Sequence, residues 1–142
     1  MNKSMNQKPR TMLKKIISFM PLSLGMLVYT RIIKKTPLRY PVNALIRKQI
    51  PEQMNIEEGI LLLNQRDPAV SGMLAMGSYE PFETELIRKA LKPGMTVVDI
   101  GANIGFFSVI AAQRVGASGK VFSFEPEPTN YSFLQKNITA NR

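Results

Sequence analysis

The sequence lacks cysteine and histidine altogether, although it has 142 residues. Without cysteine the chain forms no disulfide and offers no thiolate nucleophile. Without histidine it lacks the commonest general base and the usual ligand of zinc and other transition metals. The absence of cysteine fits a reducing compartment. We therefore expect a cytoplasmic protein with no metal site.

Acidic residues are missing from the first third of the chain. Residues 1–50 hold eleven Lys and Arg but no Asp or Glu, which gives a net charge of +11. Residues 51–142 hold eight Lys and Arg and ten Asp and Glu, which gives a net charge of −2. The overall content of 44% apolar and 20% charged residues is typical of a globular protein. We therefore predict a basic, partly helical N-terminal extension at residues 1–50 and a separate domain at residues 51–142.

The extension also lacks an apolar run long enough to cross a membrane. Its uncharged segment 16–30 is fifteen residues long, which is about 22 Å as a helix against roughly 30 Å of hydrocarbon. Three alternatives stay open: a helix that packs on the domain, peripheral contact of residues 1–35 with an anionic membrane, and a signal or anchor. Because the basic residues have no interleaved aromatic side chains and match no recognition module, the sequence argues against a nucleic-acid partner.

A strand, a glycine turn, a helix and a second strand stand at the centre of the predicted domain. They are expected, in chain order, at residues 96–100, 101–105, 106–115 and 120–124. Asp99 lies at the end of the first strand, and Glu125 directly follows the second. This order within about thirty residues is typical of the βαβ unit of nucleotide-binding α/β folds.

The flanking segments predict further elements. We expect a short strand at 59–64, a brief helix at 70–76, a helix at 82–92 and a helix at 128–141. The helix at 82–92 carries apolar residues at helical spacing, from Phe82 through Leu86 to Leu91, and we expect that stripe to pack on the sheet. Pro37 and Pro41 predict an extended backbone at residues 38–40.

The glycine turn has the pattern G-x-N-x-G. Gly101 and Gly105 allow a sharp turn and a close approach of the backbone to a ligand, and Asn103 accepts a left-handed conformation. This differs from the G-x-G-x-x-G of a dinucleotide site. Asp99 suits a cationic or amine-bearing ligand, and Glu125 is placed to accept both hydroxyls of a ribose. The pattern therefore favours a nucleoside ligand over a purely structural turn.

The sequence allows two interpretations of Tyr79 and Glu80, which precede the helix at 82–92. Tyr79 and Glu80 lie in the loop that precedes Pro81. They either overhang a ligand at the glycine turn or are solvated loop residues.

Three blocks of sequence resemble the FkbM family of S-adenosylmethionine-dependent methyltransferases. The blocks are Gly77–Pro81, Val97–Ser108 and Gly119–Pro126, within a likeness that covers roughly residues 56–142. The resemblance implies an α/β, Rossmann-like class I methyltransferase fold with S-adenosyl-L-methionine as cofactor. It implies that the cofactor is held by Asp99, Gly101, Ala102, Asn103, Gly105 and Glu125, with Tyr79 and Glu80 nearby. It also implies methyl transfer to a hydroxyl of a sugar or natural product.

The resemblance extends to the end of the given sequence at residue 142. We expect the chain to be the C-terminally truncated, N-terminal piece of a longer methyltransferase, in which further strands would carry the adenine contact, the acceptor site and a catalytic base. We therefore expect only the first βαβα portion of the domain, and no catalytic residue is identified. Two alternatives stay open: an NAD-dependent oxidoreductase, which the missing third glycine disfavours, and a non-catalytic nucleoside-binding or membrane-associated remnant.

Overall fold

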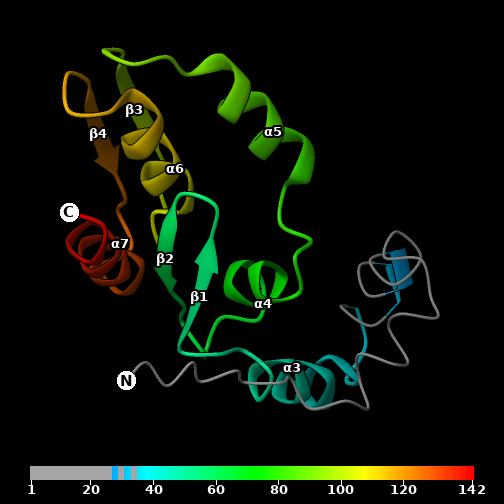
Figure 1. Ribbon diagram of the computed structural model, residues 1–142. Coiled ribbons are helices and arrows are strands. Elements are labelled where there is room, and N and C mark those ends of the chain that lie inside the picture. The colour runs from blue at the N-terminus through cyan, green and yellow to red at the C-terminus, as the bar shows by residue number, and fades with distance from the viewer. Residues whose placement is uncertain (1–26, 29–30, 33–34) are drawn as a thin grey trace, which may run out of the picture. The chain divides into compact units, whose positions relative to one another are not determined.

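The computed structural model describes residues 27–28, 31–32 and 35–142 (Figure 1). The chain divides into two units, Met1–Val42 and Asn43–Arg142. The predictions for segment 16–30 concern residues that lie almost wholly outside the described ranges. Among the residues that are described, no helix is both long enough and apolar enough to cross a bilayer.

The first regular element contradicts a prediction from the prolines. Helix α3, Arg39–Arg47, includes residues that were expected to be extended. Pro41 is its third residue, and an N–H at that position has no partner within the helix, so its absence costs little. The steric restriction that proline places on Tyr40 is therefore overridden by helix formation.

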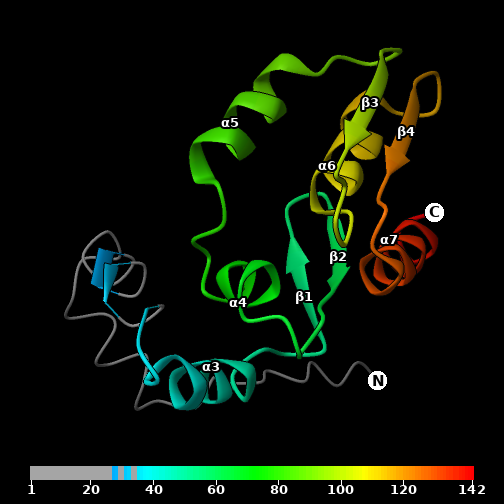
Figure 2. The same ribbon diagram turned by 180° about the vertical axis from the view of Figure 1, so that it is seen from behind.

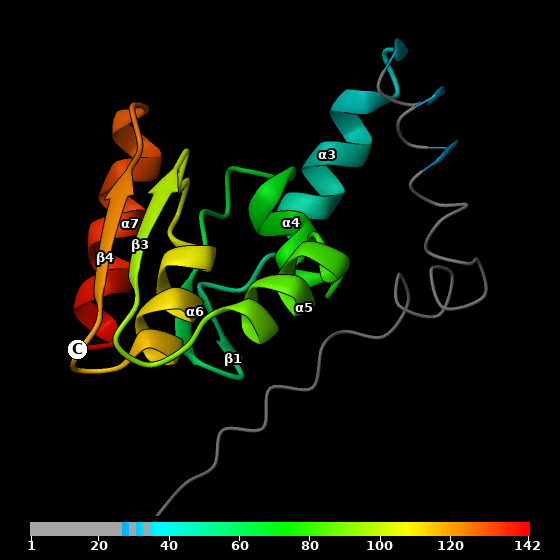
Figure 3. The ribbon, with the colours of Figure 1, turned by 90° about the horizontal axis from the view of Figure 1, so that it is seen from above.

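The predicted βαβ unit is confirmed at the expected positions. Strands β3, Thr96–Ile100, and β4, Lys120–Phe124, pair in parallel with Val98 opposite Phe122. Helix α6, Phe106–Val115, connects them and lies against both. Six of its ten residues are buried, because it lies between the strands and the rest of the domain. Figure 3 shows the two arrowheads side by side, so the carboxyl ends of both strands share one edge.

A second, antiparallel sheet precedes the βαβ unit. Strand β1, Gln53–Ile56, and strand β2, Gly59–Leu62, form a hairpin that does not pair with β3 or β4. The strand expected at 59–64 is therefore confirmed in place. Strand β1 was not predicted, because four residues with only two apolar side chains give too weak an alternation.

The main core lies between the hairpin, helix α4 at Val70–Ala75, and α6. Its buried members are Ile50, Leu61, Leu63, Leu74, Ile104, Phe106, Val109 and Ile110. Helix α4 matches its predicted position, and the Asp67 carboxylate accepts hydrogen bonds from three backbone amides at its start. The core therefore includes Ile104 of the glycine turn, and this fixes one side of the turn.

Helix α5, Pro81–Ala90, lies close to the predicted range of 82–92 but packs on a different neighbour. The expected packing of its apolar stripe on the sheet is wrong, since Phe82 is 74% and Leu86 56% exposed. Because α6 covers the inner face of β3 and β4, α5 contacts α6 instead. Its inner side carries Arg88, which pairs with Glu58 of the hairpin turn at 2.7 Å.

Helix α7, Pro128–Ala140, completes the unit and packs against β2 and α6. The outer face of β3 and β4 stays bare: Val98, Ile100, Phe122 and Phe124 are 49–83% exposed. Figure 2 shows this face with no element of residues 43–142 in front of it. Parallel sheets are normally covered on both faces. The arrangement is therefore an incomplete Rossmann-like α/β fold, as the sequence predicted.

Candidate cofactor site

Six of the predicted site residues lie at the carboxyl ends of β3 and β4, namely Asp99, Gly101, Ala102, Asn103, Gly105 and Glu125, whereas Tyr79 and Glu80 lie before α5. The backbone amides of Gly101 and Ala102 both donate to the carbonyl oxygen of Phe124, at 2.9 and 3.0 Å. These two bonds tie the beginning of the glycine turn to the end of β4. Ala102 is itself buried, so it contributes its backbone to the site and its side chain to the core.

The turn takes the left-handed conformations that its sequence predicts. Gly101, Asn103 and Gly105 have φ angles of 78°, 50° and 89°. The side-chain oxygen of Asn103 accepts a hydrogen bond from the Ile104 amide at 2.8 Å. This local bond compensates part of the cost of a positive φ at a residue with a Cβ. The left-handed conformation predicted for Asn103 is confirmed.

The two glycines serve different purposes. A Cβ on Gly101 would meet nothing within 4 Å, whereas a Cβ on Gly105 would lie 2.7 Å from Leu134 Cδ1. At Gly101 the free space lies beside the turn, where a ligand has room to approach. At Gly105 the space is taken by α7, so its small size serves packing of the protein on itself. Close approach of the backbone to a ligand therefore stays a prediction for Gly101, whereas at Gly105 the space is occupied by Leu134 of α7.

Glu125 is held by backbone amides on both sides. Its Oε2 accepts from the Asn103 amide at 2.8 Å, and its Oε1 accepts from the Glu127 amide at 2.9 Å. Each carboxylate oxygen has two acceptor positions, so both oxygens keep capacity for another donor. The side chain is half-buried and oriented before any ligand arrives. Such an orientation suits a bidentate contact with two adjacent hydroxyls.

Asp99 faces α6. Its Oδ2 accepts from Ser108 Oγ at 2.6 Å, and Ser108 Oγ lies 2.8 Å from Ser123 Oγ. The two serines therefore fix the carboxylate at the strand end. Sequence reasoning missed both. The available signal was Ser108, a polar residue in an otherwise apolar helix segment, and the inward position of Ser123 on alternating strand β4.

Tyr79 belongs to the core rather than to solvent. Its ring lies edge-on to Phe106 at 5.7 Å and near Phe107 at 6.3 Å. Burial, followed by the negative charges of Glu80, Asp67 and Asp99, raises the pKa of its phenol. Tyr79 therefore stays protonated at neutral pH and is unsuited to act as a base. Glu80 is exposed and has a left-handed backbone (φ 40°) at the start of α5.

Two grooves lie beside helix α7. One of about 390 Å³ runs between β4 and α7, and another of about 440 Å³ lies between the end of β2 and α7. Neither groove is lined by the glycine turn or by Glu125.

Comparisons with known proteins agree with this geometry. A family model described as the TRM5/TYW2 methyltransferase domain matches residues 76–142. This range contains the turn and every predicted site residue. Residues 76–142 are therefore similar to part of a class I methyltransferase domain. Methyltransferases of this kind use S-adenosyl-L-methionine as cofactor, which is the cofactor that the sequence predicted.

Curated relatives are also methyltransferases. The chain is 42% identical over 68 residues to ribosomal RNA large subunit methyltransferase E of Acinetobacter baumannii (strain ATCC 17978), covering 45% of this chain and 32% of that protein. It is 35% identical over 72 residues to the protein of that name from Azoarcus sp. (strain BH72), covering 48% and 35%. No solved structure matches the chain.

The chain thus spans about a third of the length of these curated relatives. Their names also require a correction. The sequence argued against a nucleic-acid partner, and that prediction is overturned because the relatives that share this segment are ribosomal RNA methyltransferases. The error arose because the argument considered only the basic extension, whereas the similarity lies in the methyltransferase segment.

Proposed function

We propose that this chain is the cofactor-binding portion of an S-adenosylmethionine-dependent methyltransferase. The observation that carries the proposal is the Glu125 carboxylate, which the amides of Asn103 and Glu127 hold at the edge where the glycine turn begins. The residues fit the cofactor chemically. Glu125 has acceptor capacity for the ribose hydroxyls, Gly101 leaves room beside the turn, and Asp99 supplies a carboxylate for an amino group.

Each residue has a definite task in this proposal. The cofactor supplies an activated methyl group on a sulfonium. Glu125 fixes the ribose, while the turn and Asp99 fix the methionine end, so that the methyl is held in one orientation. Orientation of reacting groups accounts for a large part of the rate in displacements of this kind. The Tyr79 ring packs edge-on against Phe106, the residue that directly follows the turn.

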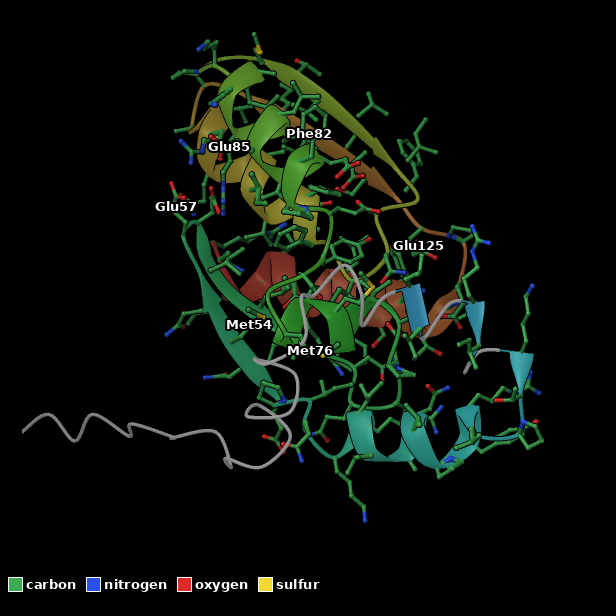
Figure 4. All side chains as sticks on the ribbon, turned by 90° about the vertical axis from the view of Figure 1, so that its right-hand side faces the viewer. Met54, Glu57, Met76, Phe82, Glu85 and Glu125 are labelled. Atoms are coloured by element: carbon green, nitrogen blue, oxygen red, sulfur yellow. The ribbon has the colours of Figure 1, made fainter. Side chains whose placement is uncertain are left out.

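Equilibrium binding of S-adenosylhomocysteine to the full 142-residue chain tests the cofactor assignment. Glu125→Gln should weaken binding about tenfold, because it replaces charge-assisted bonds by neutral ones. Glu85→Gln is the matched control, since Glu85 is exposed on α5 and pairs only with Lys89 among the described residues. Figure 4 labels both glutamates. If Glu125→Gln and Glu85→Gln bind alike, the ribose assignment is wrong.

We propose RNA as the acceptor. The names of the curated relatives support this, and so does the net charge of +11 in residues 1–50, which suits a phosphate backbone. The test is transfer of tritiated methyl from S-adenosylmethionine to ribosomal RNA. Label should enter acid-precipitable material and be released by ribonuclease. Label that resists ribonuclease would contradict an RNA acceptor.

A hydroxyl of a sugar or natural product is the second candidate. The three sequence blocks that resemble the FkbM family favour it, and they lie in the same segment. In the same assay this acceptor would give methyl label in small molecules extracted from cells, independent of ribonuclease. The two outcomes are therefore separable in one experiment.

A further inference from the structure

We propose that Asn137 is a positioning residue that holds the glycine turn in its ligand-binding geometry. Asn137 lies on α7, 32 residues beyond Gly105 in sequence, and no part of the sequence argument singled it out. The inference rests on the proposed function, because it concerns the same cofactor site. It adds a residue whose effect on the cofactor passes through the backbone of the turn.

The Asn137 side chain is fully buried and makes three hydrogen bonds. Its Oδ1 accepts from the Leu62 amide at 2.6 Å, and its Nδ2 donates to the Leu62 carbonyl at 3.1 Å and to the Ile104 carbonyl at 2.7 Å. Both amide hydrogens are thus used. The side chain joins three separate elements: α7, the edge of β2 and the glycine turn.

The bond to Ile104 leads directly to the site. The Asn103 amide, in the residue that precedes Ile104, donates to Glu125 Oε2, and the Glu127 amide at the start of α7 donates to Glu125 Oε1. Helix α7 therefore holds the turn through Asn137, and its N-cap residue, Glu127, holds Glu125. A shift of the turn relative to α7 would move the Asn103 amide away from the carboxylate.

Close packing leaves the turn little freedom to adjust. A Cβ placed on Gly105 would lie 2.7 Å from Leu134 Cδ1 and 3.9 Å from Asn137 Cβ. The backbone of the turn therefore rests on α7 at the point where Asn137 bonds it. This contact and the bond to Ile104 together fix both the distance and the direction of the turn.

The chain contains a matched control for this bond. Asn141, the residue that directly follows α7, accepts from the Ile60 amide at 2.9 Å and donates to the Ile60 carbonyl at 2.7 Å. Its side chain therefore pairs with β2 as that of Asn137 does, but it also donates to the backbone carbonyl of Asn137 and not to the turn. If ligand binding affects the two asparagines differently, we attribute the difference to the hydrogen bond between Asn137 and the Ile104 carbonyl.

The first experiment uses the unaltered chain, so it does not depend on a variant that folds. Nuclear magnetic resonance follows the backbone amides of Gly101 and Asn103 and the side-chain amides of Asn137 and Asn141 during titration with S-adenosylhomocysteine. We expect the turn and the Asn137 side chain to shift together, with a much smaller shift at Asn141. Turn signals that shift while Asn137 stays unchanged, or moves no more than Asn141, would overturn the positioning role. No shift at the turn would instead overturn the proposed function.

Variants give the second readout. Asn137→Ala should weaken S-adenosylhomocysteine binding by about tenfold relative to Asn141→Ala, measured at a temperature where circular dichroism shows both to be folded. Asn137→Asp, which keeps the size but loses the donor to Ile104, should behave like Asn137→Ala. Equal binding by the Asn137 and Asn141 variants would contradict the inference.

Discussion

At the residue scale, Gly101 and Gly105 show how one motif combines two requirements. Both have positive φ angles, yet only Gly105 lies against α7. The sequence predicted the turn and its left-handed Asn103, because glycine and asparagine tolerate positive φ angles better than other residues. The sequence could not distinguish the two glycines, since the side chain that lies against Gly105 belongs to Leu134, which is distant in sequence.

This difference predicts different effects of alanine. Gly105→Ala should lower the free energy of unfolding by more than the roughly 1–2 kcal/mol expected for a left-handed alanine, because its Cβ also overlaps Leu134. Gly101→Ala should cost only the conformational term and reduce ligand binding instead. Urea denaturation followed by circular dichroism measures both. A larger loss of stability in Gly101→Ala would contradict the assignment.

At the element scale, the turn of the β1–β2 hairpin is joined to two helices by ion pairs. The Glu58 side chain is 3% exposed and is bonded by Arg88 of α5 at 2.7 Å and by Arg114 of α6 at 3.0 Å. Glu57, labelled in Figure 4, adds a contact with Arg114. The sequence predicted most elements correctly but not these neighbours, because periodicity shows which face is apolar and not what covers it.

The ion pairs predict how stability depends on pH. The hydrogen bond from Arg88, with help from Arg114 and against the effect of burial, lowers the pKa of Glu58. The stabilisation is therefore fully present above the unfolded-state pKa, about 4.3, and is lost as the pH falls through the lower folded-state pKa. Glu58→Gln should cost about 2 kcal/mol at pH 7, since it leaves two arginines without a buried partner.

Urea denaturation between pH 7 and pH 3 tests this prediction. The gap in unfolding free energy between the parent and Glu58→Gln should narrow as the pH falls below about 4. Glu85→Gln serves as control, since the exposed Glu85–Lys89 pair contributes little. A gap that stays constant over this pH range would show that the Glu58 charge does not stabilise the fold.

At the scale of the whole molecule, residues 96–140 form a βαβα unit, and one face of its parallel strands is bare. The sequence predicted this incomplete class I fold, because the motif order fixes the topology of a βαβ unit. The nature of the acceptor was not predictable from charge or aromatic content.

The bare face predicts binding of an apolar dye. Anilinonaphthalene sulfonate should fluoresce with the folded chain, since Phe122 and Phe124 are 49% and 57% exposed on that face. The double change Phe122→Thr and Phe124→Thr should reduce the signal while leaving the far-ultraviolet circular dichroism unchanged. Phe82→Thr is the control, because it removes an exposed aromatic ring from α5 and leaves the face of β3 and β4 unchanged. An equal reduction by both would place the dye elsewhere.

The central claim is that the edge formed by the glycine turn and Glu125 binds S-adenosylmethionine. The most direct measurement is calorimetric titration of the full chain with S-adenosylhomocysteine and, separately, with NAD. Both ligands contain a ribose that Glu125 could hold, but the turn lacks the third glycine of a dinucleotide site. We predict saturable binding of S-adenosylhomocysteine and no binding of NAD at the same concentration. Tighter binding of NAD, or no heat with S-adenosylhomocysteine, would contradict the account.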